Sequence, residues 1–475
     1  MTNRAGDTGS TDATVGPMTP SQRNVLIVAI LASFVAFLDG TVVNVALPAI
    51  VRDLGGGLAS QQWIVDAYLI TLGSLILLAG SLSDQFGRTR ILRVGLIGFG
   101  ITSLACALAP SAVFLIIARG LQGVSGALLV PSSLAMIISA FDGPAQSKAV
   151  GRWTAWSGIS AIVGPVIGGL FVDALSWRWV FGINVLPIGV AMFWLSKLEK
   201  PPPLEHRIPI DYPGAVLGVV GLGGPVYALI EQGTYGWTSP RVFVPLVVGV
   251  LVFASFIVVE KRSSHPMMPL ALFKVRNFWV GNVATLGIYG ALSLGSFAIT
   301  VFLQQVAGFR ATIAGIVFLP STFVMMGLSS YFGGLAGKFG PRLFMAVGPV
   351  IAGAGFLYML TMGNPVNVWT QLIPGILLFG LGMAMTVAPL TSAILGDISH
   401  EHAGIGSAVN NAVARVAGLL TIAFAGVIAA GRLDLGGFHT TLIWTAGLLI
   451  VSGVISALGI SNARTIERAA HAAER

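Results

Sequence analysis

The sequence predicts an all-α polytopic membrane protein with fourteen transmembrane helices. Its 475 residues are 55% hydrophobic and only 9% charged, whereas soluble proteins usually have about 25% charged residues. Fourteen mostly apolar runs are separated by charged or proline- and glycine-rich breaks. Since about 20 apolar residues are enough to cross a bilayer, each run is a candidate span. The composition therefore excludes a soluble globular protein.

The runs form two groups of six with a pair between them. We expect spans at residues 24–47, 60–83, 91–109, 112–139, 148–173 and 178–198, then 213–232 and 241–260, and finally 277–305, 311–337, 342–362, 368–395, 404–430 and 440–461. The regions predicted from this grouping are a disordered cytoplasmic leader (1–23), a first six-helix bundle (24–198), linkers with two inserted helices (199–276), a second bundle (277–461) and a cytoplasmic tail (462–475).

Positive charge orients these spans. We place 19 of the 26 lysines and arginines on the side of the termini, five on the other side and two inside helices. Cytoplasmic loops retain such residues, so we expect both termini in the cytoplasm. The asymmetry also explains the net charge of +8. Because the charges are spread over short loops without a basic face, nucleic-acid binding is not expected.

A short charged stretch, GSLSDQFGRTR at residues 80–90, separates the second and third runs. It resembles the loop between the second and third helices of the major facilitator superfamily. The residues that carry this match, and that we expect to control conformational change, are Gly80, Asp84, Gly87, Arg88 and Arg90. Asp84, Arg88 and Arg90 could form a charge network that holds one conformation closed, or the stretch could act only as a topology anchor.

A fainter copy of this stretch, GGLAGKFGPR at residues 333–342, recurs 253 residues later. Gly337 stands in the copy where the first stretch has its aspartate. The two six-span groups are therefore expected to be diverged parallel repeats. An arrangement of six, two and six spans resembles the fourteen-helix drug:proton antiporter branch of the superfamily. That resemblance implies the major facilitator fold of two six-helix repeats plus two inserted helices.

Four charges lie well inside the predicted spans, namely Asp39, Asp66, Arg119 and Arg415, and Glu231 lies near the end of another span. A charge at a helix centre costs about 2.5 to 3.5 kcal/mol on insertion scales. Each of these residues is therefore a functional candidate.

Asp39 and Arg119 are expected to form a pair. Asp39 lies in FLDGTVVNVALP and Arg119 in ARGLQGVSGALLVPS, which resemble the helix 1 and helix 4 signatures of the antiporter branch. Their distances in sequence from Pro48 and Pro110 put both roughly 13 Å below the outer surface. Arginine favours the charged carboxylate and burial the neutral acid, so the pair suits proton coupling. The alternative is a static pair that locks two helices. Gln122 fits either role and is also a candidate for substrate binding.

Asp66 is a second candidate for proton coupling and for substrate binding. It lies in QQWIVDAYLI, close to Trp63 and Tyr68 in sequence. An acid beside aromatic rings suits an organic cation through charge and cation–π contact. The alternative is that Asp66 reaches outward to water at the membrane edge.

A glycine-rich pattern marks the fifth span, in SGISAIVGPVIGGLFVD. It resembles the helix 5 signature associated with antiporters, and the residues that carry it are Gly164, Pro165, Gly168 and Gly169. Small residues four apart allow close helix contact, and proline permits bending. We expect a role in conformational change, although plain packing explains the glycines equally well.

The thirteenth span contributes Asn410, Asn411 and Arg415, within GIGSAVNNAVARVAG. This stretch resembles the corresponding helix of the same branch. Its polar members are candidates for substrate binding, and Arg415 either lines a cavity or braces the interface between the repeats.

The resemblance and the buried charges together predict a proton-coupled antiporter in a bacterial cytoplasmic membrane. It is expected to act as a monomer and to export hydrophobic or amphipathic drugs, in particular cations. The alternatives are export of a lipid or an endogenous metabolite, or a non-transporting scaffold. The single cysteine, Cys106, and the loop positions of the histidines predict no metal site. The chain is not expected to be an enzyme, because the one candidate catalytic pair, His206 and Asp211, lies in a proline-rich linker. Without a phosphate loop it is not expected to be an ATP-driven pump, and a proton gradient is expected in place of any cofactor.

Overall fold

The computed structural model describes residues 18–198, 211–263, 266–363, 365–398 and 403–462. Most of the predicted leader, the linker at 199–210 and the tail from 463 lie outside these residues. The described residues are helical, without strands, and include fourteen helices long and apolar enough to cross a membrane. The predicted fold class and number of spans are confirmed.

The first bundle comprises α1 (Pro20–Leu54), α2 (Leu58–Phe86), α3 (Arg88–Ala107), α4 (Ala112–Ala127), α5 (Leu129–Ala140), α6 (Gly143–Ala174), α7 (Trp179–Gly182) and α8 (Val185–Ser196). The inserted pair is α9 (Tyr212–Tyr235) and α10 (Pro240–Arg262). The second bundle follows the short η1 (Leu270–Lys274) and comprises α11 (Arg276–Gln305), α12 (Ala311–Ile316), α13 (Leu319–Phe339), α14 (Pro341–Tyr358), η2 (Met359–Thr361), η3 (Val368–Leu372), α15 (Ile373–Gly396), α16 (Ala403–Ile428) and α17 (Leu435–Gly459). Short pieces such as α4 and α5 join end to end into single spans.

The first helix begins earlier than the sequence predicts. The Thr19 hydroxyl accepts a hydrogen bond from the Gln22 backbone N–H at 3.2 Å, and the Gln22 side chain accepts one from the Thr19 N–H at 3.1 Å. This reciprocal capping box satisfies two backbone donors and starts α1 at Pro20. The leader predicted at 1–23 therefore extends too far, because its last residues belong to α1.

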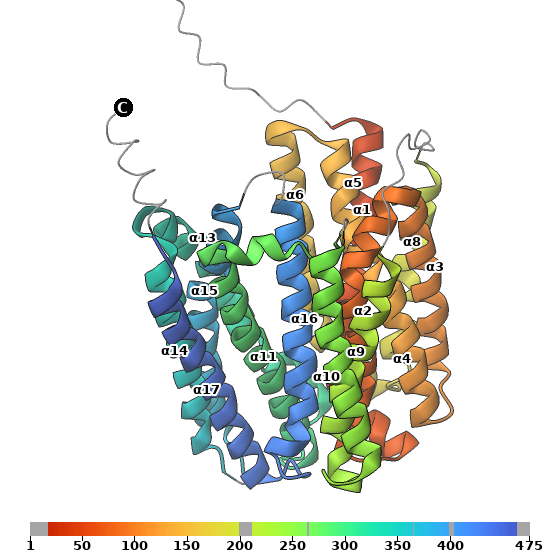
Figure 1. The fold of residues 1–475 in the computed structure, drawn as a ribbon. Helices are drawn as coiled ribbons and strands as arrows, with labels where there is room; N and C mark the ends of the chain where they lie inside the picture. The colour runs from red at the N-terminus through yellow and green to blue at the C-terminus, as the bar shows by residue number, and fades with distance from the viewer. Residues whose placement is uncertain (1–17, 199–210, 264–265, 364, 399–402, 463–475) are drawn as a thin grey trace, which may run out of the picture.

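The start of α1 and the end of α17 lie on the same side of the molecule (Figure 1). We call this the terminal side and the opposite one the far side. In the first bundle α1 packs on α6 and α2 on α4, and in the second bundle α14 packs on α15 and α17. The inserted α9 contacts α2 and α16, one helix from each bundle, whereas α10 packs on α9 (Figure 1).

Two equivalent turns confirm the internal repeat. A single residue, Gly87, separates α2 from α3, and Gly340 separates α13 from α14. Their φ angles are +93° and +87°, a region that favours glycine because it has no Cβ. The two charged stretches therefore make the same sharp turn on the terminal side, one in each bundle.

Candidate functional site

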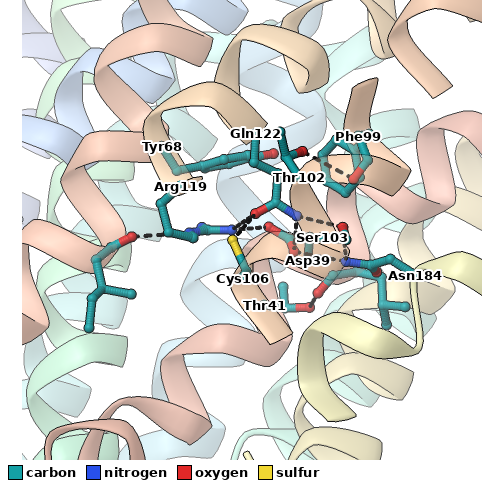
Figure 2. A network of polar contacts seen from close by, with 12 residues as sticks. Asp39, Thr41, Tyr68, Phe99, Thr102, Ser103, Cys106, Arg119, Gln122 and Asn184 are labelled. Atoms are coloured by element: carbon teal, nitrogen blue, oxygen red, sulfur yellow. Dashed lines mark hydrogen bonds and ion pairs between the residues drawn. The ribbon is translucent and has the colours of Figure 1, made fainter. Parts of the chain in front are cut away.

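A buried ion pair lies inside the first bundle. Nη1 of Arg119 on α4 lies 2.5 Å from Oδ2 of Asp39 on α1 (Figure 2). The two side chains are 1% and 0% exposed. Arg119 Nε also donates to the backbone oxygen of Ile64 on α2 at 3.1 Å. The ion pair predicted between Asp39 and Arg119 is therefore present, and its contacts link α1, α2 and α4.

Amide side chains complete this network (Figure 2). The Asp39 Oδ1 atom accepts hydrogen bonds from Gln122 Nε2 at 3.1 Å and Asn184 Nδ2 at 3.0 Å. Both amides also donate to Ser103 Oγ, at 2.8 and 3.2 Å. With Arg119, three side chains donate to the Asp39 carboxylate. Gln122 is fully buried here, so this conformation does not offer it to a substrate.

Two of these partners were missed from the sequence. Ser103, which follows Thr102, and Asn184 lie in apolar runs and carry no charge. A buried asparagine in such a run has to find hydrogen-bond partners, so Asn184 could have been proposed as part of a polar network. Its partner could not, because the pairing depends on how α3 and α8 pack.

The aromatic residues predicted to surround Asp66 lie elsewhere. The Tyr68 ring lies against the guanidinium of Arg119, 4.3 Å from its Cζ, and therefore belongs to the ion-pair network. The indole of Trp63 donates to Glu231 on α9 at 2.8 Å and packs near the Tyr227 ring. The prediction that Asp66, Trp63 and Tyr68 form one site is therefore wrong, because the two rings lie on different sides of α2.

Asp66 itself is fully buried, and neither carboxyl oxygen has a hydrogen-bond partner among the described residues. The alternative that it reaches water at the membrane edge is wrong. Three residues on the same helical face contact α16: Gln62 donates to backbone oxygens there, Leu69 lies against Gly418 and Gly73 against Arg415. Since Asp66 lies between Gln62 and Leu69 on this face, it is enclosed where the two bundles meet.

The hydrogen bonds between the two bundles, within the described part of the chain, lie towards the far side. Besides Gln62, they involve Gln304, which donates to the Val45 oxygen at 3.0 Å, and Asp173. The Asp173 carboxylate accepts from the backbone N–H groups of Ala311 and Thr312 at 3.1 and 2.9 Å, and from the Thr312 hydroxyl at 2.6 Å. We call these contacts the far-side seam.

The glycine pattern on α6 allows helices to approach closely. A Cβ on Gly164 would lie 3.4 Å from the Leu38 oxygen, and one on Gly168 would lie 3.1 Å from the Val42 oxygen, both on α1. Gly169 faces the other bundle, where a Cβ would lie 2.7 Å from the Thr312 nitrogen.

Gly315 on α12 faces back towards Pro165, and a Cβ there would lie 2.8 Å from its carbonyl carbon. Glycines on both bundles therefore let the backbones of α6 and α12 approach so closely at the far-side seam that no side chain fits between them.

The polar residues of α16 divide into three environments. Asn410 donates to Thr285 and Asn282 on α11, at 2.8 and 3.2 Å, and so packs within its own bundle. Asn411 is exposed. The Arg415 guanidinium lies 5.7 Å from the Phe37 ring of α1. Arg415 thus touches the other bundle, as bracing requires.

The charged turn on the terminal side makes one ion pair. Arg88 Nη2 lies 3.4 Å from Asp84 Oδ1, with both side chains partly exposed, and Arg88 Nη1 donates to the Ala135 oxygen of α5 at 3.0 Å. Both contacts lie inside the first bundle. Arg90 is exposed, and Gly80 has open space around it. In this conformation the turn does not join the bundles. Among the described residues, no group of three or more candidate ligands could hold a metal ion.

Comparison with known proteins agrees with this architecture. The sequence model of the Major Facilitator Superfamily matches residues 29–422. Puromycin resistance protein pur8 of Streptomyces alboniger is 35% identical over 86% of this chain and 81% of its own. Multidrug resistance protein Stp of Mycobacterium tuberculosis (strain CDC 1551 / Oshkosh) is 34% identical, covering 88% and 78%. The tetracenomycin C resistance and export protein of Streptomyces glaucescens is 34% identical, covering 86% and 76%.

Solved structures share the fold. The crystal structure of peptide transporter POT in complex with sulfate superposes with a TM-score of 0.66 at 16% identity, covering 92% of this chain and 93% of that one. At that identity, the likeness concerns the fold alone.

Proposed function

The chain belongs to the major facilitator superfamily, and from this premise we propose that it exports hydrophobic or amphipathic drugs, in particular cations, in exchange for protons. Relatives that cover most of the chain are named for multidrug resistance and for antibiotic resistance and export, which supports this substrate class. The observation that carries the proton coupling is the contrast between two buried acids. Asp39 has three side-chain donors, and Asp66 has none among the described residues.

Asp66 is the group we assign to the proton in this conformation. A buried carboxylate without a partner is very unfavourable, whereas the neutral acid costs much less. A closed far-side seam therefore favours protonated Asp66. Separation of α2 from α16 would admit water and favour the ionised form. Proton binding and closure of the seam are thus thermodynamically linked.

This linkage makes exchange possible. A cationic substrate that enters from the terminal side and displaces the proton leaves Asp66 ionised. Ionised Asp66 favours the open seam, through which the substrate leaves, and a proton taken up from the far side favours closure again. Each cycle would move substrate one way and a proton the other.

Asp39 and Arg119 have a second part in this proposal. Their network joins α1, α2 and α4 and is complete while the seam is closed. If helix movement breaks the pair, Asp39 loses its cation and becomes able to take a proton. The pair therefore regulates the change of conformation, or carries a proton itself at a later stage of the cycle.

The terminal side is assigned to the cytoplasm because the topology expected from the sequence puts 19 of the 26 lysines and arginines on that side of the membrane. Both termini are then cytoplasmic, in the cytoplasmic membrane of a bacterium. The seam is closed towards the exterior, and substrate enters from the cytoplasm. We propose that one chain is sufficient, since both bundles and the seam belong to it.

Transport in vesicles with an imposed pH gradient tests this function. Fluorescent organic cations and labelled lipids are offered as separate panels, to wild type, Asp39→Asn, Asp66→Asn and the exposed control Asp434→Asn. We expect gradient-driven movement of cations, lost in Asp66→Asn and retained in the control. Movement of the lipids alone would replace drug export by the lipid alternative. Wild-type rates in both Asp39→Asn and Asp66→Asn would contradict coupling through these acids.

A further inference from the structure

Two buried acids on the terminal side belong to neither the ion-pair network nor the seam. Asp211 directly precedes α9, and its Oδ1 accepts a hydrogen bond from the Gly214 backbone N–H at 2.8 Å. Glu260 lies near the end of α10, and its Oε2 accepts from the Met268 N–H at 3.1 Å. Asp211 is 9% exposed and Glu260 2% exposed.

Each acid has one oxygen that remains without a donor. Asp211 Oδ2 and Glu260 Oε1 are buried and have no hydrogen-bond partner among the described residues. The two carboxyl groups adjoin the same short segment. A Cβ on Gly214 would lie 2.6 Å from Asp211 Oδ2 and 3.0 Å from Met267 Cε, and the next residue, Met268, donates to Glu260. An ionised carboxylate is only an acceptor, so two of them cannot bond to each other directly, whereas a shared proton or a bound cation can join them.

The surroundings favour the proton. A buried apolar cluster at these helix ends comprises Leu78, Ala215, Phe256 and Met267, from α2, α9, α10 and the segment before η1. The neighbouring titratable residues Tyr212, Lys261 and Arg262 are exposed, and neither acid has an ion pair within the described part of the chain. A metal cation needs several oxygen ligands, and these carbon and sulfur neighbours supply none.

We propose that Asp211 and Glu260 bind one proton between them, and that this acid pair fastens the start of α9 to the end of α10 and the segment that follows. Two ionised carboxylates side by side in a buried site repel each other strongly. Loss of the proton therefore separates the two helix ends. This proton site lies on the terminal side, away from Asp66.

The proposal predicts a particular pH dependence of stability. The folded protein holds one proton that the unfolded chain, with ordinary carboxyl groups, releases above about pH 5. Stability is therefore highest at low pH and falls as the pH rises and the shared proton becomes harder to retain. Glu260→Gln replaces the proton by a permanent amide N–H donor, which bonds the Asp211 carboxylate at any pH.

Thermal unfolding of the purified full chain in detergent tests this over roughly pH 6 to 9, in sodium chloride and in choline chloride. We expect the unfolding midpoint of wild type to fall with pH more steeply than that of Glu260→Gln. Asp434→Asn is the matched control, because Asp434 caps α17 by the same type of bond, from Gly437 N–H at 2.8 Å, yet is exposed. The unfolding midpoint of Asp434→Asn should fall with pH as steeply as that of wild type.

The reciprocal variant guards against misfolding of Glu260→Gln. Asp211→Asn keeps a capping oxygen and supplies the same amide donor, so it should flatten the pH dependence equally. Equal slopes for wild type and the foldable variant would overturn the proposal. Stabilisation of wild type by sodium but not choline, lost in either variant, would also overturn it and assign the site to a metal cation.

Discussion

Replacing Asp39 by asparagine should destabilise the fold much more than replacing Asp66 by asparagine. Asp39→Asn keeps the shape of the side chain and removes its charge. Arg119, which is 1% exposed, then remains buried without an anion. Asp66→Asn replaces one neutral, unpartnered group by another of the same size, provided that Asp66 is protonated in the folded protein.

The magnitudes follow from these environments. Removing one partner of a buried ion pair costs about 3 to 5 kcal/mol, so we expect Asp39→Asn to lose roughly this much free energy of unfolding. Asp66→Asn breaks no hydrogen bond made by the described residues, and its cost should be within about 1 kcal/mol. The two variants should nevertheless share one defect, the loss of gradient-driven export.

Chemical unfolding in detergent, followed by tryptophan fluorescence, measures the difference, and transport in vesicles measures the shared defect. The double variant Asp39→Asn with Arg119→Gln is the internal control. Since it removes both charges, it should recover part of the stability that Asp39→Asn loses. A loss in Asp66→Asn as large as in Asp39→Asn would refute the reasoning, because it would mean that Asp66 is ionised and paired in the folded protein.

Four further outcomes concern the two faces and the topology. Gly169→Val should hold the far-side seam open, because its side chain would overlap the backbone of α12, whereas Gly158→Val has open space and should behave as wild type; far-side cysteine labelling compares them. Asp173→Asn should increase the same labelling by weakening the seam, and unchanged labelling would show that the carboxylate is dispensable. Asp84→Asn should leave stability nearly unchanged, since its ion pair is partly exposed. It should nevertheless alter the ratio between the form open to the terminal side and the form open to the far side, and unchanged transport and labelling would make Asp84 a topology signal only. A cysteine at the exposed Thr238, in a chain without the native cysteine, should react with an impermeant reagent in intact cells, and reaction only after permeabilisation would reverse the proposed topology.

Much of the fold could be predicted because membrane insertion leaves a strong pattern in the sequence. Span length, charge asymmetry and the repeated turn at Gly87 and Gly340 are local features. The pairing of Asp39 with Arg119 followed from the cost of a lone buried charge and from equal depth. These predictions needed no knowledge of side-chain packing.

The rest depends on which faces of the helices meet. Trp63 and Tyr68 are close to Asp66 in sequence, but a helix turns about 100° per residue and directs the two rings to different neighbours. Asn184 carries no charge and so gave no signal of its partner. Likewise, the contact between Asp211 and Glu260 joins residues from two helices and depends on how the inserted pair packs.

The position of α9 affects the free-energy cost of separating the two bundles during transport. This helix covers the line along which α2 and α16 meet, so the bundles cannot rock apart without parting α9 from one of them. Acyl chains fill the opened surface as well as leucine does, and the exchange of one apolar neighbour for another costs little. Acyl chains cannot replace the hydrogen bond from Trp63 to Glu231. We therefore expect α9 and α10 to move together with the first bundle, and lipid acyl chains to cover the surface that α9 exposes when it separates from α16.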